Sequence, residues 1–344
     1  MRSIRYLILV LTTRCNLRCR YCYNGNINLQ SDMSENVLDR ALDLVSEGEG
    51  HLHIQITGGE PTLVPDLVDM VLVKAKGKIR RPYSIGIQTN GTLLDAELIE
   101  KLKAFNVQVG VSIDGPPAVH EILRGNARAT FRSLALLESF GMPFRVTTVV
   151  TRENVLFLDK LIYALAGFES FRGIGLDLLV RKGRALSSEA IGLLDPDVLQ
   201  ESIRSILRAW ELVNRRRSLP ITIRELERLR ESSYPLSLRN FCHAAEGRSI
   251  AVMPDGSLFP CGQTAGDERF LIGDVWNYDD RKLNTLGSLR LSTNLCASCS
   301  LKEVCPGDCP SRIFYNGDEA KLMCVIYRTM WEFLLDRKRG ASLA

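Results

Sequence analysis

The segment TTRCNLRCRYCY, residues 12–23, decides how the rest of the sequence is interpreted. It follows the apolar run 4–11 and contains Cys15, Cys19 and Cys22. Three thiolates can bind three irons of a [4Fe–4S] cube and leave the fourth iron without a protein ligand. An open coordination position distinguishes a catalytic metal site from a structural one. A zinc site completed by a distant histidine is the alternative, although zinc sites usually have paired Cys-x2-Cys arms.

The composition is that of a globular protein with many cysteines. Of its 344 residues, 45% are hydrophobic and 24% are charged, while 44 basic and 40 acidic side chains give a net charge of +4. This charge gives no case for a nucleic-acid or membrane partner. We find no apolar run of the ~20 residues that a transmembrane helix needs and no secretory cleavage site. We therefore expect a cytoplasmic protein whose ten cysteines bind metal and do not form disulfides.

Segments typical of strands and helices alternate through the first two thirds of the chain. Apolar, β-branched runs predict strands at 4–11, 52–57, 83–89, 107–113, 144–150 and 171–180. Helices are predicted after the N-caps Ser34 and Asp95 and over 131–140, 155–166 and 197–217. Right-handed crossovers wind such units into a barrel or an open doubly wound sheet. Six units favour an α/β fold with a partial (β/α)6 TIM-like barrel, two units short of a closed one.

The remaining cysteines form a second group and indicate three regions of the chain. These are a barrel over 1–217, a bridging segment over 218–240 that is rich in Arg and Glu, and a small cysteine-rich domain over 241–344. Seven thiolates divide as four plus three, enough for one fully ligated and one partly open cube. A zinc ribbon with leftover cysteines, or disulfides, are the alternatives. With short segments and Gly and Pro turns, this domain is expected to need clusters to hold its shape.

Polar motifs follow or end several predicted strands. They are Gly58-Gly59-Glu60, the segment 88–92 with Asn90, the segment 112–116 with Ser112 and Asp114, and the segment 147–150 with Thr148. Parallel α/β sheets gather their ligand sites at the C-terminal ends of the strands. Each motif alone is also explained by a tight turn or a buried strand, so the argument depends on their common position.

The cysteine loop, with Tyr21 before its last cysteine, resembles the signature of radical S-adenosylmethionine (SAM) enzymes. In that family the open iron binds SAM, and the reduced cluster cleaves SAM to a 5′-deoxyadenosyl radical that abstracts a substrate hydrogen. The resemblance implies that Gly58, Gly59 and Glu60 hold the SAM amino group. It also implies SAM contacts from Ser112 and an ion pair between Arg124 and the SAM carboxylate. Tyr21, Asn90, Asp114 and Thr148 complete the implied SAM site, and His120 receives no catalytic role.

The second cysteine group resembles the SPASM extension of radical SAM enzymes, which carries two auxiliary [4Fe–4S] clusters. The resemblance implies that Cys242, Cys261 and Cys309 hold the first auxiliary cluster. It implies that the second is held by a group of four: Cys296, Cys299, Cys305 and Cys324. The first auxiliary cluster would then have one position for substrate, another side chain or water.

The family resemblance implies oxidative modification of a peptide or protein side chain, as in ribosomal peptide maturation by thioether or carbon–carbon crosslinks. A small molecule such as a haem precursor is the alternative substrate, and a non-enzymatic electron-transfer protein is a third hypothesis. Formylglycine-forming members have an acidic residue after the cysteine that matches Cys261, whereas this chain has Gly262-Gln263.

Further expectations concern partners and acid–base groups. The cluster begins by residue 15, which leaves no room for a leader-binding domain, so a separate leader-binding protein is a possible partner. Flavodoxin or ferredoxin is implied as the reductant. Asp177, at the end of the sixth predicted strand, and Asp274 are the acid–base candidates.

Overall fold

A single curved sheet organises the molecule. The computed structural model describes residues 3–25, 30–187, 194–230, 241–289, 294–317 and 321–341. The sheet has ten strands in the order β10-β9-β8-β1-β2-β3-β4-β5-β6-β7. From β1 to β7, each strand lies beside the next one in the sequence. A doubly wound sheet would reverse this order at a switch point, so the strand order confirms the partial barrel and excludes the open alternative.

The six predicted strands are confirmed, and all neighbours from β1 to β7 are parallel. The bounds of β2, β3 and β5 coincide with the predicted runs. The strands are β1 (Tyr6–Val10), β2 (Leu52–Thr57), β3 (Tyr83–Thr89), β4 (Gln108–Ser112), β5 (Phe144–Val150), β6 (Phe171–Leu178), β7 (Thr222–Ile223), β8 (Ser249–Val252), β9 (Ser257–Phe259) and β10 (Gly273–Asp274).

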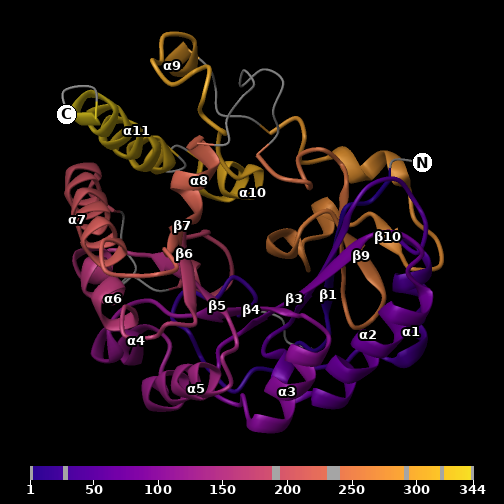
Figure 1. Ribbon diagram of the computed structural model, residues 1–344. Coiled ribbons are helices and arrows are strands. Elements are labelled where there is room, and N and C mark those ends of the chain that lie inside the picture. The colour runs from indigo at the N-terminus through magenta and orange to yellow at the C-terminus, as the bar shows by residue number, and fades with distance from the viewer. Residues whose placement is uncertain are drawn as a thin grey trace.

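Helices cover the outer side of the curved sheet (Figure 1). The helices on this side are α1 (Glu35–Asp43), α2 (Pro65–Lys78), α3 (Ala96–Ala104), α4 (Pro117–Leu123), α5 (Ala127–Ser139), α6 (Leu158–Leu165) and α7 (Pro196–Asn214). The rest of the chain adds α8 (Arg224–Arg230), α9 (Asn294–Ala297), α10 (Pro310–Asn316) and α11 (Leu322–Ala341). The predicted caps are confirmed, because Ser34 accepts a hydrogen bond from the Val37 amide and Asp95 from the Leu98 amide. Helices α2 and α4 are additional to the predicted set.

The core lies between the sheet and these helices. Along β2, Leu52, Ile54 and Ile56 are fully buried, while the residues between them are half-buried and point to the opposite, inner side of the barrel. Each fully buried Leu or Ile contributes roughly 1.5 to 3 kcal/mol. The inner side is polar instead: the Tyr6 hydroxyl donates to Gln55 Oε1 over 3.3 Å, and His53 Nδ1 lies 2.9 Å from Ser84 Oγ.

The C-terminal region extends the same sheet. Strand β8 pairs in parallel with β1, and β9 and β10 follow in antiparallel order. On the other edge, β7 lies within the predicted bridging segment, of which residues 231–240 fall outside the described residues. The proposed division into three regions stays a prediction, because the sheet runs through all of them.

The C-terminal region also buries more apolar surface than its sequence suggested. Helix α11 packs against α7, where the Phe333 and Trp210 rings are 6.2 Å apart. Met323, Ile326 and Met330 on α11 belong to the main core. Sheet pairing and helix packing therefore help to stabilise this region, and its need for clusters stays a prediction.

Replacing Asp95 by alanine removes the cap of α3. We expect Asp95→Ala to lower the free energy of unfolding by about 1 kcal/mol, because the Leu98 amide loses its acceptor. Urea unfolding measures this loss. Asp95→Asn keeps an acceptor oxygen and serves as the control, so an equal loss in both variants would contradict the capping role.

Candidate functional site

The first three cysteines lie in a loop that leaves the C-terminal end of β1. Cys15 is exposed, whereas Cys19 and Cys22 are half-buried. The Cys22 amide donates to the Cys19 carbonyl over 3.3 Å, and the Leu17 amide lies 3.4 Å from Cys15 Sγ. Burial, assisted by the neighbouring Cys19 and Cys22, raises the pKa of Cys15 to about 11. The raised pKa of Cys15 means that a positively charged partner, such as a bound metal, favours its thiolate.

Gly58 and Gly59 hold this loop against the end of β2. The Gly59 amide donates to the Thr12 carbonyl over 2.7 Å, and the Glu60 amide donates to the Arg14 carbonyl over 2.9 Å. A Cβ on Gly58 would lie 2.6 Å from the Thr12 oxygen, and a Cβ on Gly59 would overlap the Arg14 carbonyl. The glycines are therefore needed for a close approach to the chain's own cysteine loop, in addition to any approach to SAM.

The Glu60 carboxylate is buried and already bonded within the protein. Its Oε1 accepts from Thr62 and Thr89, and its Oε2 accepts from the Asn90 amide over 2.7 Å. Burial raises the pKa of Glu60, and these hydrogen bonds oppose the shift. The side chain that the resemblance assigns to SAM thus connects the ends of β2 and β3.

Asn90 continues this connection to the cysteine loop. Its Nδ2 donates to Asn16 Oδ1 over 2.9 Å, and Asn16 Nδ2 donates to Thr92 Oγ1 over 2.8 Å. Asn16 lies directly after Cys15, so the end of β3 orients the first cysteine. The segment 88–92 therefore does more than form a turn.

Asp114 is the centre of a buried charged group beside Cys19. It is fully buried and accepts from Tyr21 Oη, from Arg124 Nε over 2.6 Å and from the Val149 amide over 2.9 Å. Arg124 Nη1 in turn lies 4.0 Å from Cys19 Sγ. Burial raises the pKa of the Cys19 thiol, and Arg124 opposes that shift. Asp114 thus fixes the guanidinium that the resemblance assigns to the SAM carboxylate.

The two remaining predicted SAM contacts also have partners within the sheet. Ser112 Oγ accepts from Gln88 Nε2 over 2.8 Å on the inner side of the barrel. Thr148 is fully buried, and its hydroxyl donates to the Ile113 carbonyl over 2.5 Å. Both residues lie at the predicted strand ends, and their contacts with SAM stay predictions.

Sequence reasoning missed a clamp on the cysteine loop from the segment after β6. Arg184 Nε donates to the Cys19 carbonyl over 2.9 Å, and its amide donates to the Cys22 carbonyl over 3.0 Å. Gly183 has φ of +62°, and a Cβ there would lie 2.5 Å from the Cys22 oxygen. The glycine that follows Lys182 was the available signal.

Two further buried groups near the site have unpaired polar atoms. Glu153 Oε2, at the end of β5, has no hydrogen-bond partner among the described residues. Its neighbour Asn154 donates to the Asp114 carbonyl over 2.8 Å, which places this turn beside the Asp114 group. Both ring nitrogens of His120 are also unpaired within the described chain, and burial lowers its pKa to about 4. Glu153 can accept a hydrogen bond from a bound ligand.

Electrostatic proximity relates the seven C-terminal cysteines to one another in two sets. Burial raises the pKa of Cys261 to about 12, and the nearby Cys309 and Cys242 add to the shift. Burial likewise raises the pKa of Cys305 to about 11, and its neighbouring thiols are Cys324, Cys299 and Cys296. The three-plus-four division of ligands stays a prediction, which this proximity supports.

The donor chemistry fits iron–sulfur clusters. All ten cysteines are free thiols. Within the described ranges, no three His, Cys, Asp or Glu side chains converge closely enough to hold a single metal ion. A four-iron cluster sets its thiolates wider apart, because each binds a different iron. Cysteine-only donor sets fit iron–sulfur clusters, which are held by thiolates.

The two predicted acid–base residues occupy different surroundings. Asp177, at the end of β6, pairs with Arg224 Nη2 over 2.7 Å and faces Arg312 Nη1 at 3.8 Å. Burial opposes its charge, but the two guanidinium groups outweigh burial and keep the pKa below its usual value. Asp274 in β10 accepts from the Trp276 and Asn277 amides of its own turn. Burial, Cys22 and Asp177 all raise the pKa of Tyr23, which places Asp177 near the cysteine loop.

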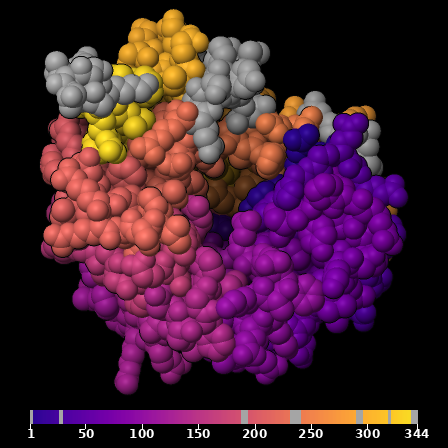
Figure 2. Space-filling model, in the orientation of Figure 1, coloured from indigo at the N-terminus to yellow at the C-terminus, as the bar shows by residue number. Residues whose placement is uncertain are grey.

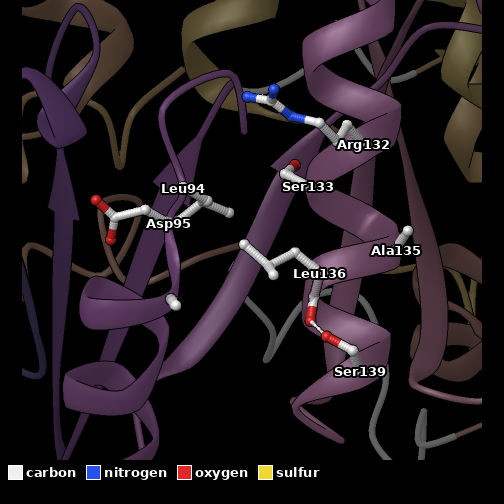
Figure 3. Close-up of a pocket in the computed structure, with 8 residues that line it drawn as sticks. Leu94, Asp95, Arg132, Ser133, Ala135, Leu136 and Ser139 are labelled. Atoms are coloured by element: carbon white, nitrogen blue, oxygen red, sulfur yellow. Dashed lines mark hydrogen bonds between the residues drawn. The ribbon is translucent and has the colours of Figure 1, made fainter.

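The surface has a hollow where a ligand could enter. Figure 2 shows it near the centre of one face, at the position that the curved sheet surrounds in Figure 1. A separate groove of about 460 Å³ lies outside the barrel between α3 and α5, lined by Leu94, Arg132 and Leu136 among others (Figure 3). That groove contains none of the predicted site residues. In the part of the chain that the structure describes, no helix is long and apolar enough to cross a membrane.

A partial parallel barrel with a three-cysteine loop at the end of β1 defines a class of enzymes that cleave SAM at an open cluster. The sequence profile of the Radical SAM superfamily matches residues 9–155. An uncharacterized protein of Methanocaldococcus jannaschii is 30% identical over 77% of this chain and 87% of its own length. The chain belongs to the radical SAM superfamily, and it is a radical SAM enzyme.

Relatives with named activities align over most of the chain. An AdoMet-dependent heme synthase of Methanosarcina barkeri is 26% identical over 88% of this chain and 90% of its own length. A cysteine-type anaerobic sulfatase-maturating enzyme of Clostridium perfringens is 25% identical over 98% of both chains. The solved structure of native anSMEcpe with bound AdoMet and Kp18Cys peptide has a TM-score of 0.78 at 21% identity and covers 98% of both chains. It confirms the fold, including the C-terminal cysteine-rich region.

Replacing Gly59 by alanine tests the glycine contact with the cysteine loop. We expect Gly59→Ala to displace residues 12–14 and to lower cluster binding by Cys15, Cys19 and Cys22, because the new methyl group overlaps a backbone carbonyl. Iron content and the visible absorption of the reconstituted protein measure this loss.

Gly77→Ala provides the matched control. A Cβ on Gly77 in α2 meets no atom within 4 Å, so alanine there should leave iron content unchanged and stabilise the helix by about 0.5 to 1 kcal/mol. Full iron content in Gly59→Ala would contradict the proposed contact.

Proposed function

We propose that this enzyme uses a 5′-deoxyadenosyl radical to abstract hydrogen from a peptide or protein side chain and to oxidise that side chain. SAM bound to the cluster at Cys15, Cys19 and Cys22 supplies the radical. Two auxiliary [4Fe–4S] clusters, at the groups of three and four cysteines, would accept and pass on electrons. The protein itself orients these groups and the substrate inside the barrel.

The position of β1 between two cysteine groups carries this proposal. Its C-terminal end continues into the cysteine loop, while Tyr6 at its other end packs beside Cys242 and Cys261. Strand geometry separates Tyr6 from Val10 by about 13 Å. A substrate on the inner side of β1 would therefore lie between the source of the radical and an acceptor for its electron.

The inner side of the barrel suits the amide groups of a peptide. The side chains of Tyr6, Gln55, Gln88 and Ser112 offer hydroxyl and carboxamide groups that can donate or accept. Sulfatase-maturating relatives, whose name describes action on a protein, align over nearly the whole chain. Because this chain has Gly262-Gln263 after Cys261, we do not propose formylglycine formation as its reaction.

Asp177 has a binding role in this proposal. Its low pKa keeps it ionised, which makes it a weak base but a good acceptor for a substrate N–H group. Arg224 and Arg312 limit its movement at the end of β6. Asp274 would only cap its turn. The proposal further includes a cytoplasmic location, a flavodoxin or ferredoxin as the reductant, and a separate leader-binding protein.

A haem precursor is the second candidate substrate. The named heme synthase is as similar in sequence as the sulfatase-maturating relative. A porphyrin carries carboxylates, so its binding would use the positive charge of Arg224 near the inner side of the barrel. A peptide substrate would therefore donate an N–H group to Asp177, whereas a haem precursor would place a carboxylate against Arg224.

The radical chemistry depends on the first cysteine group. We expect the triple variant Cys15→Ala/Cys19→Ala/Cys22→Ala to form no 5′-deoxyadenosine from SAM under anaerobic reducing conditions, because the open iron is lost. Liquid chromatography measures this product. A Cys242→Ala variant is the control and should still cleave SAM, since Cys242 lies in another group; 5′-deoxyadenosine from the triple variant would exclude the proposal.

The substrate is tested by mass spectrometry of two candidate classes. We expect anaerobic incubation with SAM and dithionite to lower the mass of a peptide encoded beside the gene by two hydrogens. One hydrogen would leave as an atom to the 5′-deoxyadenosyl radical, and the second would leave as a proton when the substrate radical gives its electron to an auxiliary cluster. Asp177→Asn should weaken peptide binding about tenfold, equivalent to about 1.4 kcal/mol. Conversion of a porphyrin with no change in any peptide would support the haem alternative.

A further inference from the structure

Two polar side chains, Gln263 and Ser311, lie at the sulfur of Cys309. Ser311 Oγ is 3.0 Å from Cys309 Sγ, and Gln263 Oε1 is 3.4 Å from it. The Ser311 hydroxyl also donates to Gln263 Oε1, so the three side chains form a closed triangle of contacts. None of these contacts was expected from the sequence.

The triangle joins the loop after Cys261 to the loop after Cys309. These are two of the three cysteines that are predicted to hold the first auxiliary cluster. Gln263 lies in the turn that follows Cys261, where the Thr264 amide donates to the Cys261 carbonyl over 3.0 Å. Ser311 lies in the first turn of α10, two residues after Cys309. Lys182 holds the Gln263 turn from the barrel side, because its Nζ donates to the Gln263 carbonyl over 3.0 Å and to the Ala265 carbonyl over 2.5 Å.

The triangle is shielded from water. Ser311 is 1% exposed and Cys309 is 9% exposed, while Gln263 is half-buried. The contact between Ser311 and the sulfur therefore lies in a low-dielectric environment, where hydrogen bonds are stronger than at the surface.

Ser311 and Gln263 contact the sulfur of Cys309. They do not supply the missing fourth ligand of the cluster that Cys242, Cys261 and Cys309 are predicted to hold. An iron that binds a cysteine in a four-iron cube is already filled by three sulfides and that thiolate. Side chains within hydrogen-bonding distance of Cys309 Sγ would therefore lie beside an iron whose four ligand positions are already filled. Their effect is exerted through the sulfur, as hydrogen bonds to metal ligands generally tune a metal centre.

Metal binding changes the direction of these hydrogen bonds. The free Cys309 thiol can donate to Gln263 Oε1, whereas the metal-bound thiolate can only accept. The Ser311 hydroxyl can rotate toward the sulfur, and the Gln263 carboxamide can turn about its terminal torsion to present its NH2 group. Both side chains can then donate to the thiolate.

We propose that Ser311 and Gln263 are positioning residues that hydrogen-bond to the Cys309 thiolate and raise the reduction potential of the cluster held with Cys242 and Cys261. This inference rests on the auxiliary clusters of the proposed function. Hydrogen bonds to cluster sulfurs stabilise the more electron-rich, reduced state. A raised potential suits a cluster that accepts the electron released when a substrate radical is oxidised.

Redox titration of the reconstituted holoenzyme, followed by electron paramagnetic resonance, tests this proposal. We expect Ser311→Ala to shift the midpoint potential of one cluster to a more negative value, and Ser311→Ala/Gln263→Leu to shift it further, with the other two clusters unchanged. Ser311→Thr keeps the hydroxyl group and should restore the potential. Ser288→Ala, at an exposed serine whose hydroxyl donates to the Thr285 carbonyl, is the matched control.

Unchanged potentials in the double variant, at full iron content, would overturn the inference. An equal shift in Ser311→Thr and Ser311→Ala would overturn it as well, because the hydroxyl would then have no role. If Ser311→Ala does not load its clusters, Gln263→Leu alone decides the question by the same shift.

The outcomes separate this inference from the proposed function. If the enzyme oxidises a peptide but the variants leave all midpoint potentials unchanged, only the proposed role of Ser311 and Gln263 is excluded. If the wild-type enzyme contains only enough iron for one cluster, both the auxiliary clusters and this inference are excluded. The proposed cleavage of SAM would not be affected.

Discussion

The rest of the site depends on the close approach of two backbone segments, one from β1 and one from β2. The amides of Gly59 and Glu60 donate to the carbonyls of Thr12 and Arg14, and this contact is possible only because the glycines have no Cβ. Backbone contacts of the protein itself thereby attach the cysteine loop to the strand edge. Asn16, Asn90 and the clamp at Arg184 then add contacts from β3 and from the segment after β6. The loop is held from several strand ends of one barrel edge, which preorganises its thiols.

Electrostatics near the loop follow from the same arrangement. Asp114 is fully buried, and it is tolerated there because Tyr21, Arg124 and the Val149 amide satisfy its oxygens. The carboxylate in turn holds the guanidinium close to Cys19. Removing either partner would leave an uncompensated buried charge, which typically costs about 3 to 5 kcal/mol. The ion pair between Asp114 and Arg124 therefore stabilises the site and also orients the guanidinium toward Cys19.

The sequence predicted the barrel well, because β-branched runs and N-caps are local signals. The bounds of β2, β3 and β5 and the caps of Ser34 and Asp95 agree with the structure. Helix α2 was missed although Val68, Val71, Leu72 and Ala75 have helical spacing. Gly183 could indicate a turn beside Arg184, but not its contact with Cys19, which joins residues 165 positions apart. Glu60 was found as a site residue, but its bonds to Thr62, Thr89 and Asn90 depend on the spacing of two loops that no local pattern encodes.

Pairing of β8 with β1 explains how cysteines more than two hundred residues apart become neighbours. The β8–β9 hairpin lies between Cys242 and Cys261 in the sequence, and β8 aligns Ser249 with Tyr6. Gly262 packs near Ile8 of β1, where a Cβ would lie 3.9 Å from the isoleucine Cγ2. The three-cysteine group is thus positioned by the same strand that carries the first cysteine loop. Because β1 pairs with β2 on one side and with β8 on the other, the sheet helps to determine how the two cysteine groups lie relative to each other.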